Sequence, residues 1–305
     1  MEFLRFLESI RTPFGDIFMS LITMLGEETL FMAVALVFFW CLDKRRGYYL
    51  LVTGFVGTVC VQILKMTFRI PRPWEAGGIS YVESAREAAT GYSFPSGHTQ
   101  IATNLYGGVA RSSKRRAVQI GGWIVCVLIA FSRMYLGVHT PLDVGVSLLI
   151  GITLVWGLYP LVYRSYDRPV RMYCVIGGML LLTLGNLLFV MLGDFPTATA
   201  ADLANVQNAQ KVAWQFFALI LGMCIIYPLD THVLRFDTRA PLLGQCAKLL
   251  LGLGITVALR ALLKAPLNAL LGVNLGAALR YFIIVLFAGI LWPMTFRFWA
   301  RLGKR

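Results

Sequence analysis

Charged residues are scarce in this sequence of 305 residues. Asp, Glu, Lys and Arg together make up 14% of it, while 58% of the residues are hydrophobic and the mean hydropathy is +0.70. A water-soluble domain carries about 25% charged residues. So little polar surface excludes a water-soluble globule, because lipid must solvate much of the chain.

Histidine is also scarce, with three in the chain, and the six cysteines form no CxxC pair. The cysteines lie in or at the ends of apolar segments, with no histidine near them in the sequence: Cys41, Cys60, Cys126, Cys174, Cys224 and Cys246. This pattern indicates buried apolar residues and excludes a disulfide framework or a cysteine-based metal site. The first twelve residues lack a basic stretch followed by an apolar one, so we expect no cleavable signal peptide.

Acidic residues are outnumbered by basic ones, 15 to 28, which gives a net charge of +13. The basic residues fall in short clusters between apolar runs, which is typical of membrane topology signals and argues against a nucleic-acid partner. If the apolar runs cross a membrane in turn, 17 of the 28 lie on one side and 11 on the other. The positive-inside rule then places the chain's end in the cytoplasm.

No stretch of about ten residues alternates as a membrane barrel strand would, so helices are the only plausible spans. Nine apolar stretches are long enough, or nearly so, to cross a bilayer as helices. The sequence therefore predicts an all-α polytopic membrane helix bundle of about nine spans. The expected spans are 28–42, 47–66, 97–111, 117–134, 141–163, 171–193, 211–229, 246–263 and 277–296.

The first residues are amphipathic rather than uniformly apolar. Phe3, Leu7 and Ile10 recur at helical spacing beside charged residues, which favours a helix lying in the membrane interface. An extra span at 13–25 is the alternative and would make ten. We thus divide the chain into an interfacial segment at 1–27, a core at 28–163 and four additional spans of unknown role at 164–305.

Three polar patches lie at the ends of expected spans, where polar residues are costly in a membrane. If the expected spans cross the membrane one after another, all three patches fall on the same side. They run from Lys65 to Pro73, from Phe94 to Thr99 and from Ser132 to Asp143. Under the positive-inside rule this side is outside.

Three cations of the patches, Lys65, Arg72 and Arg133, occur together with His98 and His139. So many positive charges repel a metal cation, so we expect no metal site. An oxyanion fits instead, because Arg presents a planar fork to phosphate oxygens and Lys a point charge. Ser96 is a natural N-cap, and Gly97 lets the backbone approach a ligand closely.

The third patch repeats this helix start. Thr140 is a candidate N-cap, Pro141 suits the first helical position and Asp143 completes a capping box. His139 and Asp143 are four residues apart, close enough for the carboxylate to orient the imidazole. One histidine would attack phosphorus, and the other would protonate the leaving oxygen and then activate water.

Together the patches resemble the signature of the type 2 phosphatidic acid phosphatase superfamily. They read Lys-x6-Arg-Pro, Pro-Ser-Gly-His and Ser-Arg-x5-His-x3-Asp, complete and in order between Lys65 and Asp143. The resemblance covers about residues 28–163 and implies a helical core in which the motif-bearing spans pack together. The four later spans lie outside it.

The resemblance also implies roles for single residues. It makes His139 the nucleophile that forms a phosphohistidine, Asp143 its orienting partner and His98 the general acid. It implies a phosphate site without metal or other cofactor, built from Lys65, Arg72, Ser96, Gly97 and Arg133.

The implied activity is hydrolysis of an amphiphilic phosphate at the extracytoplasmic face of the membrane, the inner or plasma membrane if the source is bacterial. Candidate substrates are undecaprenyl and other polyprenyl diphosphates, phosphatidic acid, phosphatidylglycerol phosphate and sphingoid-base phosphates. Two alternatives stay open: a lipid phosphotransferase using the same phosphoenzyme, and a non-catalytic phospholipid-binding or transport protein. The low charge content argues against a soluble vanadate-dependent oxidase of the same superfamily.

Overall fold

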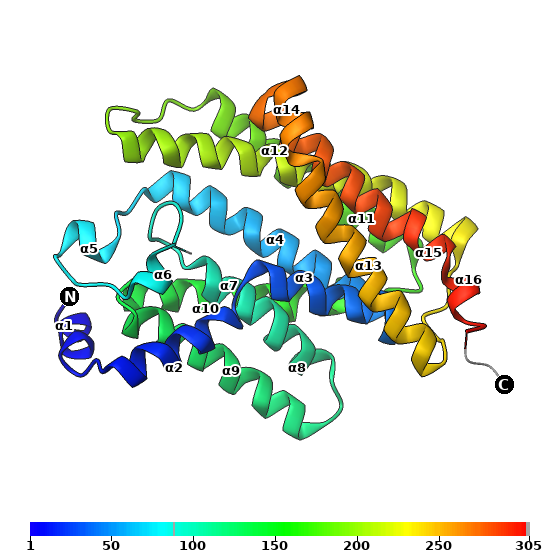
Figure 1. Cartoon of the computed structure of the whole chain (residues 1–305), viewed down its shortest axis with the longest axis horizontal. Helices are drawn as coiled ribbons and strands as arrows, with labels where there is room; N and C mark the ends of the chain where they lie inside the picture. Colours follow the sequence, from blue (N-terminus) through cyan, green and yellow to red (C-terminus); the bar gives the residue numbers. More distant parts are fainter. Residues whose placement is uncertain (88, 303–305) are drawn as a thin grey trace. The chain divides into compact units, whose positions relative to one another are not determined.

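The computed structural model describes residues 1–87 and 89–302, and 81% of it is helical, with no strand among those residues. The all-α prediction is therefore confirmed (Figure 1). Lys304 and Arg305, which we counted among the cytoplasmic cations, lie outside the described residues.

The chain forms two compact units, each continuous in space but not in sequence. Unit 1 comprises Met1–Val34, Tyr49–Arg164 and Thr197–Asn205. Unit 2 comprises Ala35–Tyr48, Ser165–Pro196 and Val206–Arg305.

Ten α-helices precede residue 160: α1 (Glu2–Ser9), α2 (Pro13–Met24), α3 (Glu28–Val37), α4 (Lys44–Phe68), α5 (Pro73–Ala76), α6 (Glu83–Glu87), α7 (Gly97–Ala102), α8 (Gly108–Ser112), α9 (Arg116–Tyr135) and α10 (Pro141–Leu158). Six follow: α11 (Pro169–Leu192), α12 (Ala200–Leu229), α13 (Leu242–Leu262), α14 (Lys264–Leu286), α15 (Trp292–Met294) and α16 (Phe296–Trp299). Short π-helical turns extend several of them: η1 (Phe38–Leu42), η2 (Thr103–Gly107), η3 (Tyr159–Tyr163), η4 (Asp230–Leu234) and η5 (Phe287–Leu291).

Seven helices among the described residues are long and apolar enough to cross a membrane. They become eight if α2 and the α3–η1 helix, which meet at a bend of 45°, form one broken span. The predicted count of nine is not confirmed. The interfacial segment at 1–27 and the alternative span at 13–25 both stay predictions.

The predicted span at 97–111 accounts for part of the difference. The structure has a helix of nearly the same extent there, from Gly97 to Ser112, made of α7, η2 and α8. It is shorter than a typical membrane span and packs against α9 and α10. Thr99, Gln100, Thr103 and Asn104 are fully buried in it. Its side chains therefore meet protein rather than lipid, and this is why its polar content is tolerated.

Helix α1 is amphipathic as predicted, but its buried face differs from the expected one. Leu4 and Leu7 are buried against Ile79, Phe131 and Met134. Of the predicted apolar stripe only Leu7 is buried, while Phe3 and Ile10 are 44% and 48% exposed. The helix thus covers the end of α9 in unit 1 and turns other apolar side chains outward.

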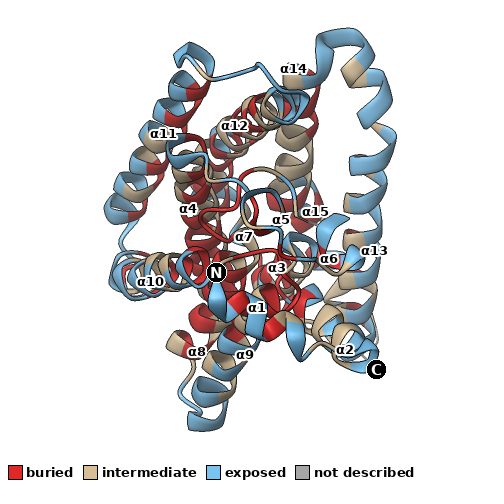
Figure 2. Ribbon diagram, turned by 90° about the vertical axis from the view of Figure 1, so that its left-hand side faces the viewer, coloured by how far each residue is buried: buried red, intermediate tan, exposed pale blue. Residues whose placement is uncertain are grey.

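Large apolar side chains are exposed along the helices of unit 2. Figure 2 shows most of α13, and many positions of α11, in the colour of exposed residues. Leu181 on α11 and Leu250 on α13 are 71% and 70% exposed. Extended apolar surface of this kind is costly in water, and in a membrane bundle it is the surface that lipid covers.

Candidate active site

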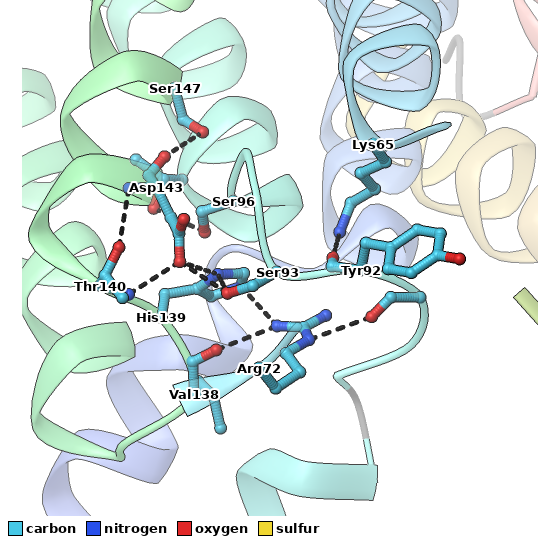
Figure 3. A network of polar contacts seen from close by, with 12 residues as sticks. Lys65, Arg72, Tyr92, Ser93, Ser96, Val138, His139, Thr140, Asp143 and Ser147 are labelled. Carbon is cyan, nitrogen blue, oxygen red and sulfur yellow. Dashed lines mark hydrogen bonds and ion pairs between the residues drawn. The ribbon is translucent and has the colours of Figure 1, made fainter. Parts of the chain in front are cut away.

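The three sequence patches come together in unit 1 (Figure 3), and five of the predicted site side chains with a charge or an imidazole are buried there. The exposed fractions are 7% for Lys65, 3% for Arg72, 0% for Arg133, 2% for His139 and 1% for Asp143. Arg72, Arg133, Lys65 and His98 all lie close enough to act electrostatically on His139. Residues from three separate stretches of the sequence thus share one buried site.

A tight turn between α9 and α10 carries His139. Gly137 has a φ of +76°, a region that residues with a Cβ rarely adopt, and a Cβ there would meet the carbonyl oxygen of Ser80 at 2.3 Å. Helix α10 then begins with the predicted capping box. The Asp143 amide donates to Thr140 Oγ1 at 3.2 Å, and the Thr140 amide donates to Asp143 Oδ2 at 2.8 Å. The cap fixes the Asp143 carboxylate beside the imidazole.

The hydrogen bonds around His139 define which ring nitrogen carries the proton. Nε2 lies 2.9 Å from Nη1 of Arg72, which can only donate, so Nε2 is the acceptor. Nδ1 therefore carries the hydrogen and faces Asp143 Oδ2 at 3.4 Å. Ser93 Oγ donates to the same carboxylate oxygen at 2.6 Å. The Nε2 lone pair consequently points away from the carboxylate and toward Arg72.

His139 is neutral in this site. Burial, followed by the positive charges of Arg72, Arg133 and Lys65, holds the pKa of His139 well below its ordinary value of 6.5. The contact between His139 and Asp143 is for that reason not an ion pair, although its geometry would allow one. A neutral imidazole keeps the lone pair that a nucleophile needs.

Arg72 is fully engaged with the protein around it. Its Nε donates to the carbonyl of Gly91 at 3.1 Å and its Nη2 to that of Thr90 at 2.9 Å. Its Nη1 donates to the carbonyl of Val138 at 3.0 Å as well as to His139. Arg72 thus ties the loop before α7 to the turn that carries His139, and it covers the imidazole lone pair.

Lys65, at the end of α4, donates to the carbonyl of Tyr92 in the same loop. The Tyr92 hydroxyl in turn donates to Asp202 Oδ1 at 3.0 Å, within unit 1. The main-chain carbonyls of residues 90 to 92 therefore accept hydrogen bonds from Lys65 and Arg72, two of the predicted phosphate ligands.

Arg133 and His98 are bonded differently. Arg133 Nη1 donates to Thr23 Oγ1 at 2.8 Å, whereas its Nε and Nη2 have no hydrogen-bond partner among the described residues. The same holds for Nε2 of His98 within the described part of the chain. Buried polar atoms without partners are costly, and each calls for an explanation. These three donors or acceptors are available to a bound group.

Ser96 is at the N-cap position of α7, as predicted, but its side chain does not cap the helix. Its hydroxyl accepts from Thr99 Oγ1 at 3.0 Å, and its amide donates to the carbonyl of Asp143 at 3.2 Å. A Cβ on Gly97 would have no heavy atom within 4 Å. Ser96 therefore joins α7 to α10, and Gly97 leaves open space at the helix start.

Some contributors to the site were not identified from the sequence. Ser93 contacts the carboxylate of Asp143 directly, yet it lies outside the three patches and carries no periodic or motif signal. The carbonyls that Lys65 and Arg72 bind carry no side-chain signal at all. Thr23 lies in the segment that the sequence assigned to the membrane interface. In the described residues, no three His, Cys, Asp or Glu side chains are close enough to hold a metal ion.

Comparisons with known proteins agree with the three patches. Residues 45–167 match the family model of the PAP2 superfamily, and residues 214–305 match that of the PAP2 superfamily phosphatase transmembrane extension. The second match falls within the region of the four later spans, for which the sequence predicted no role.

Three curated relatives are similar over the motif-bearing part. A probable sphingosine-1-phosphate phosphatase of Dictyostelium discoideum is 29% identical, over 48% of this chain and 38% of its own. An undecaprenyl-diphosphatase of Sulfolobus acidocaldarius is 30% identical, over 41% of this chain and 60% of its own. The undecaprenyl-diphosphatase BcrC of Bacillus subtilis is 30% identical, over 43% of this chain and 67% of its own.

The chain spans less than two thirds of the length of the first two relatives. The matched range 45–167 contains all three patches, from Lys65 to Asp143, and residues 214–305 match the extension of the same family. The chain belongs to the PAP2 superfamily, the type 2 phosphatidic acid phosphatases, and is an integral membrane protein.

Proposed function

We propose that this protein is a metal-independent lipid phosphatase that hydrolyses a lipid phosphate or diphosphate at the extracytoplasmic face of the membrane through a phosphohistidine on His139. The observation that carries the proposal is the neutral imidazole of His139, held by Asp143 at Nδ1 and bonded at Nε2 to Arg72, in a site that also buries Lys65 and Arg133. That arrangement suits attack on an anionic phosphorus centre.

In the first half-reaction the substrate's phosphoryl oxygens bind the free donors of Arg133 and the charge of Lys65. Arg72 Nη1 transfers its hydrogen bond from His139 Nε2 to a phosphoryl oxygen, which uncovers the lone pair. The Nε2 lone pair then forms a bond to phosphorus while the bond from phosphorus to the leaving oxygen breaks. His98 donates a proton to that oxygen, so the lipid leaves as an alcohol, or as a monophosphate if the substrate was a diphosphate.

In the second half-reaction water attacks the phosphohistidine. His98, now without its proton, accepts one from the water as the new phosphorus–oxygen bond forms and the phosphorus–nitrogen bond breaks. Inorganic phosphate leaves, and Arg72 returns to Nε2. The Ser96–Gly97 backbone, next to open space at the start of α7, completes the phosphate site.

The substrate class follows from the membrane and from the relatives. A site between membrane helices suits a substrate whose tail stays in lipid. The relatives are named for sphingosine 1-phosphate and undecaprenyl diphosphate, so both are candidates here, together with phosphatidic acid and phosphatidylglycerol phosphate. The extracytoplasmic position rests on the distribution of Lys and Arg along the sequence.

The test is phosphate release by the purified protein from these four lipids and glucose 6-phosphate, with EDTA present. We expect release from at least one lipid and its loss in His139→Ala. Release that is unchanged by this substitution would contradict the proposal. A competing alcohol in the same assay distinguishes a phosphotransferase, because the phosphoryl group would then appear on the alcohol.

A further inference from the structure

Helix α2 buries one residue, and that residue is polar. All twelve residues of α2 are described, and only Thr23 is buried, with 5% of its surface exposed. Apolar neighbours on the same helix face outward, including Phe14 at 79%, Ile17 at 64% and Leu21 at 59% exposed. Lipid can cover such outward apolar side chains in a membrane protein, so the feature that needs a reason is the buried hydroxyl of Thr23.

The buried hydroxyl faces the site. Thr23 Oγ1 accepts from Arg133 Nη1 at 2.8 Å, and the Arg133 side chain is fully buried. Within the described residues this is the hydrogen bond that holds the guanidinium, since Nε and Nη2 have no partner there. Rotation of the guanidinium about its stem is therefore restrained at Nη1.

The guanidinium nitrogen that bonds Thr23 decides which edge of Arg133 stays free for phosphate. In a guanidinium, Nε–H and one Nη2–H point the same way along one edge, and this pair matches two oxygens of a phosphate. By taking Nη1, Thr23 leaves this edge whole and unoccupied. A bond from Thr23 to Nη2 would have blocked it.

Other contacts hold α2 where the Thr23 hydroxyl reaches Arg133. Arg11, just before α2, donates from Nε to the carbonyl of Tyr135 at 2.7 Å, and the Thr12 amide donates to the Tyr135 hydroxyl at 3.2 Å. After α2, a Cβ on Gly26 would lie 3.2 Å from the carbonyl oxygen of His98 and 2.9 Å from Ile129. The N-terminal segment is thus fixed at both ends of α2, close to the site.

We propose that Thr23 is a positioning residue for Arg133: it presents the Nε–Nη2 edge of the guanidinium to the phosphoryl group. Thr23 precedes the matched family region, which begins at residue 45, so the N-terminal segment contributes to the site as well as to the membrane interface. The inference rests on the proposed phosphatase function and assigns to that site a residue outside its three motifs.

The experiment compares Thr23→Val, which keeps the shape and removes the acceptor, with Thr23→Ser, which keeps the acceptor. Thr153→Val is the matched control, because the Thr153 hydroxyl bonds only to the carbonyl of Leu149 on its own exposed helix face. Lipid-phosphate hydrolysis and the binding of inorganic phosphate are measured for each variant. We expect Thr23→Val to lower kcat/KM and phosphate affinity about tenfold, the effect of a lost hydrogen bond to a charged group.

Thr23→Ser should recover activity to within about twofold, and Thr153→Val should resemble the wild type. Thr23→Val in an Arg133→Lys background distinguishes a positioning role of Thr23 from a general packing role. Lysine has no fork to orient, so Thr23→Val should have no further effect there, whereas a packing defect would lower activity again.

Three results would overturn the inference: phosphate affinity in Thr23→Val equal to that of Thr153→Val, no recovery in Thr23→Ser, or an equal loss in the Arg133→Lys background. A wild-type protein that releases no phosphate would overturn the proposed function instead. The binding of inorganic phosphate still tests Thr23 in that case, because it needs no turnover.

Discussion

Both units bury positive charge, and Lys44 of unit 2 is stabilised differently from the three site cations of unit 1. In unit 2, Lys44 forms an ion pair with the buried Asp230 at 2.7 Å and lies 3.4 Å from the centroid of the Phe236 ring. The Tyr48 hydroxyl donates to the other oxygen of the same carboxylate at 2.9 Å. In unit 1, none of the ion pairs found among the described residues involves the three site cations.

On the proposed function, Lys44 carries a structural charge and the three site cations carry charges that bind phosphate. A buried cation with an acidic partner has its charge balanced within the protein. Lys65, Arg72 and Arg133 face carbonyls, a hydroxyl and an imidazole, which leave their positive charge unbalanced. On the proposed function an anionic ligand supplies the opposite charge. Lys248 in unit 2 is also buried without an ion pair and donates to the carbonyl of Thr238, so burial without an acidic partner does not by itself identify a binding site.

The largest expected effect is on activity, from Arg133→Ala. Loss of a charged donor to the phosphoryl group should lower kcat/KM roughly 100- to 1,000-fold. The melting temperature should change little, because no ion pair is broken and one of several like charges is removed. Kinetics and thermal unfolding in detergent check both. A large drop in melting temperature with normal specific activity would erase the distinction between the units.

In unit 2 we expect a substitution to lower stability and to leave activity unchanged. Asp230→Asn leaves Lys44 buried without its counter-charge and should lower the free energy of unfolding by about 3 kcal/mol. Phosphate release per folded molecule should stay unchanged. Asp167→Asn is the control, because the Arg45–Asp167 pair is exposed, with Asp167 73% exposed, and such pairs contribute less than about 1 kcal/mol. Equal destabilisation by the two substitutions would count against a special role for Asp230.

A smaller effect is expected from Ser93→Ala. The substitution removes the 2.6 Å hydrogen bond to Asp143 Oδ2 and leaves the carboxylate freer to turn from His139. We expect kcat to fall about tenfold with KM nearly unchanged. Ser147→Ala serves as control, since the Ser147 hydroxyl donates to the main-chain carbonyl of Asp143 and not to its carboxylate. Similar losses from both variants would show that the carboxylate's orientation is not what Ser93 controls.

The smallest effect is a shift in pH dependence. Because burial and the cations hold the pKa of His139 well below 6.5, kcat/KM should persist as pH falls through 6.5 and decline only in more acidic solution. Removing a cation favours the protonated imidazole and raises its pKa. Lys65→Met should therefore shift the decline of kcat/KM in acidic solution to higher pH, by less than about one unit. A shift the other way would contradict the neutral nucleophile.

The sequence predicted the parts of the site that depend on side chains in fixed spacing. The capping box of Thr140 and Asp143 follows from their spacing at a helix start, and the contact of Asp143 with His139 follows from their separation by four residues across that start. The membrane class and the all-helical fold follow from composition. Ser93 and Thr23 were out of reach because a lone hydroxyl has no periodic signal, and its role appears only when its partner's position in space is known.

The number of spans was harder to predict for a related reason. Hydropathy does not distinguish a helix covered by lipid from one covered by protein. The helix from Gly97 to Ser112 contains enough apolar residues to suggest a span, but its buried polar side chains belong to the protein interior. The bend of 45° after α2 likewise depends on contacts with α9 and is not encoded by local composition.

The hydrogen bond from Arg72 to Nε2 of His139 has a consequence for selectivity on the proposed mechanism. The Nε2 lone pair of His139 stays hydrogen-bonded to Arg72 until a ligand competes for the guanidinium, and only oxygens with negative charge compete well. A neutral phosphotriester of the same shape and size would reach the pocket and leave this hydrogen bond in place. The site would thus discriminate by charge at the moment of reaction rather than by fit alone, and its histidine would stay protected from uncharged electrophiles dissolved in the membrane.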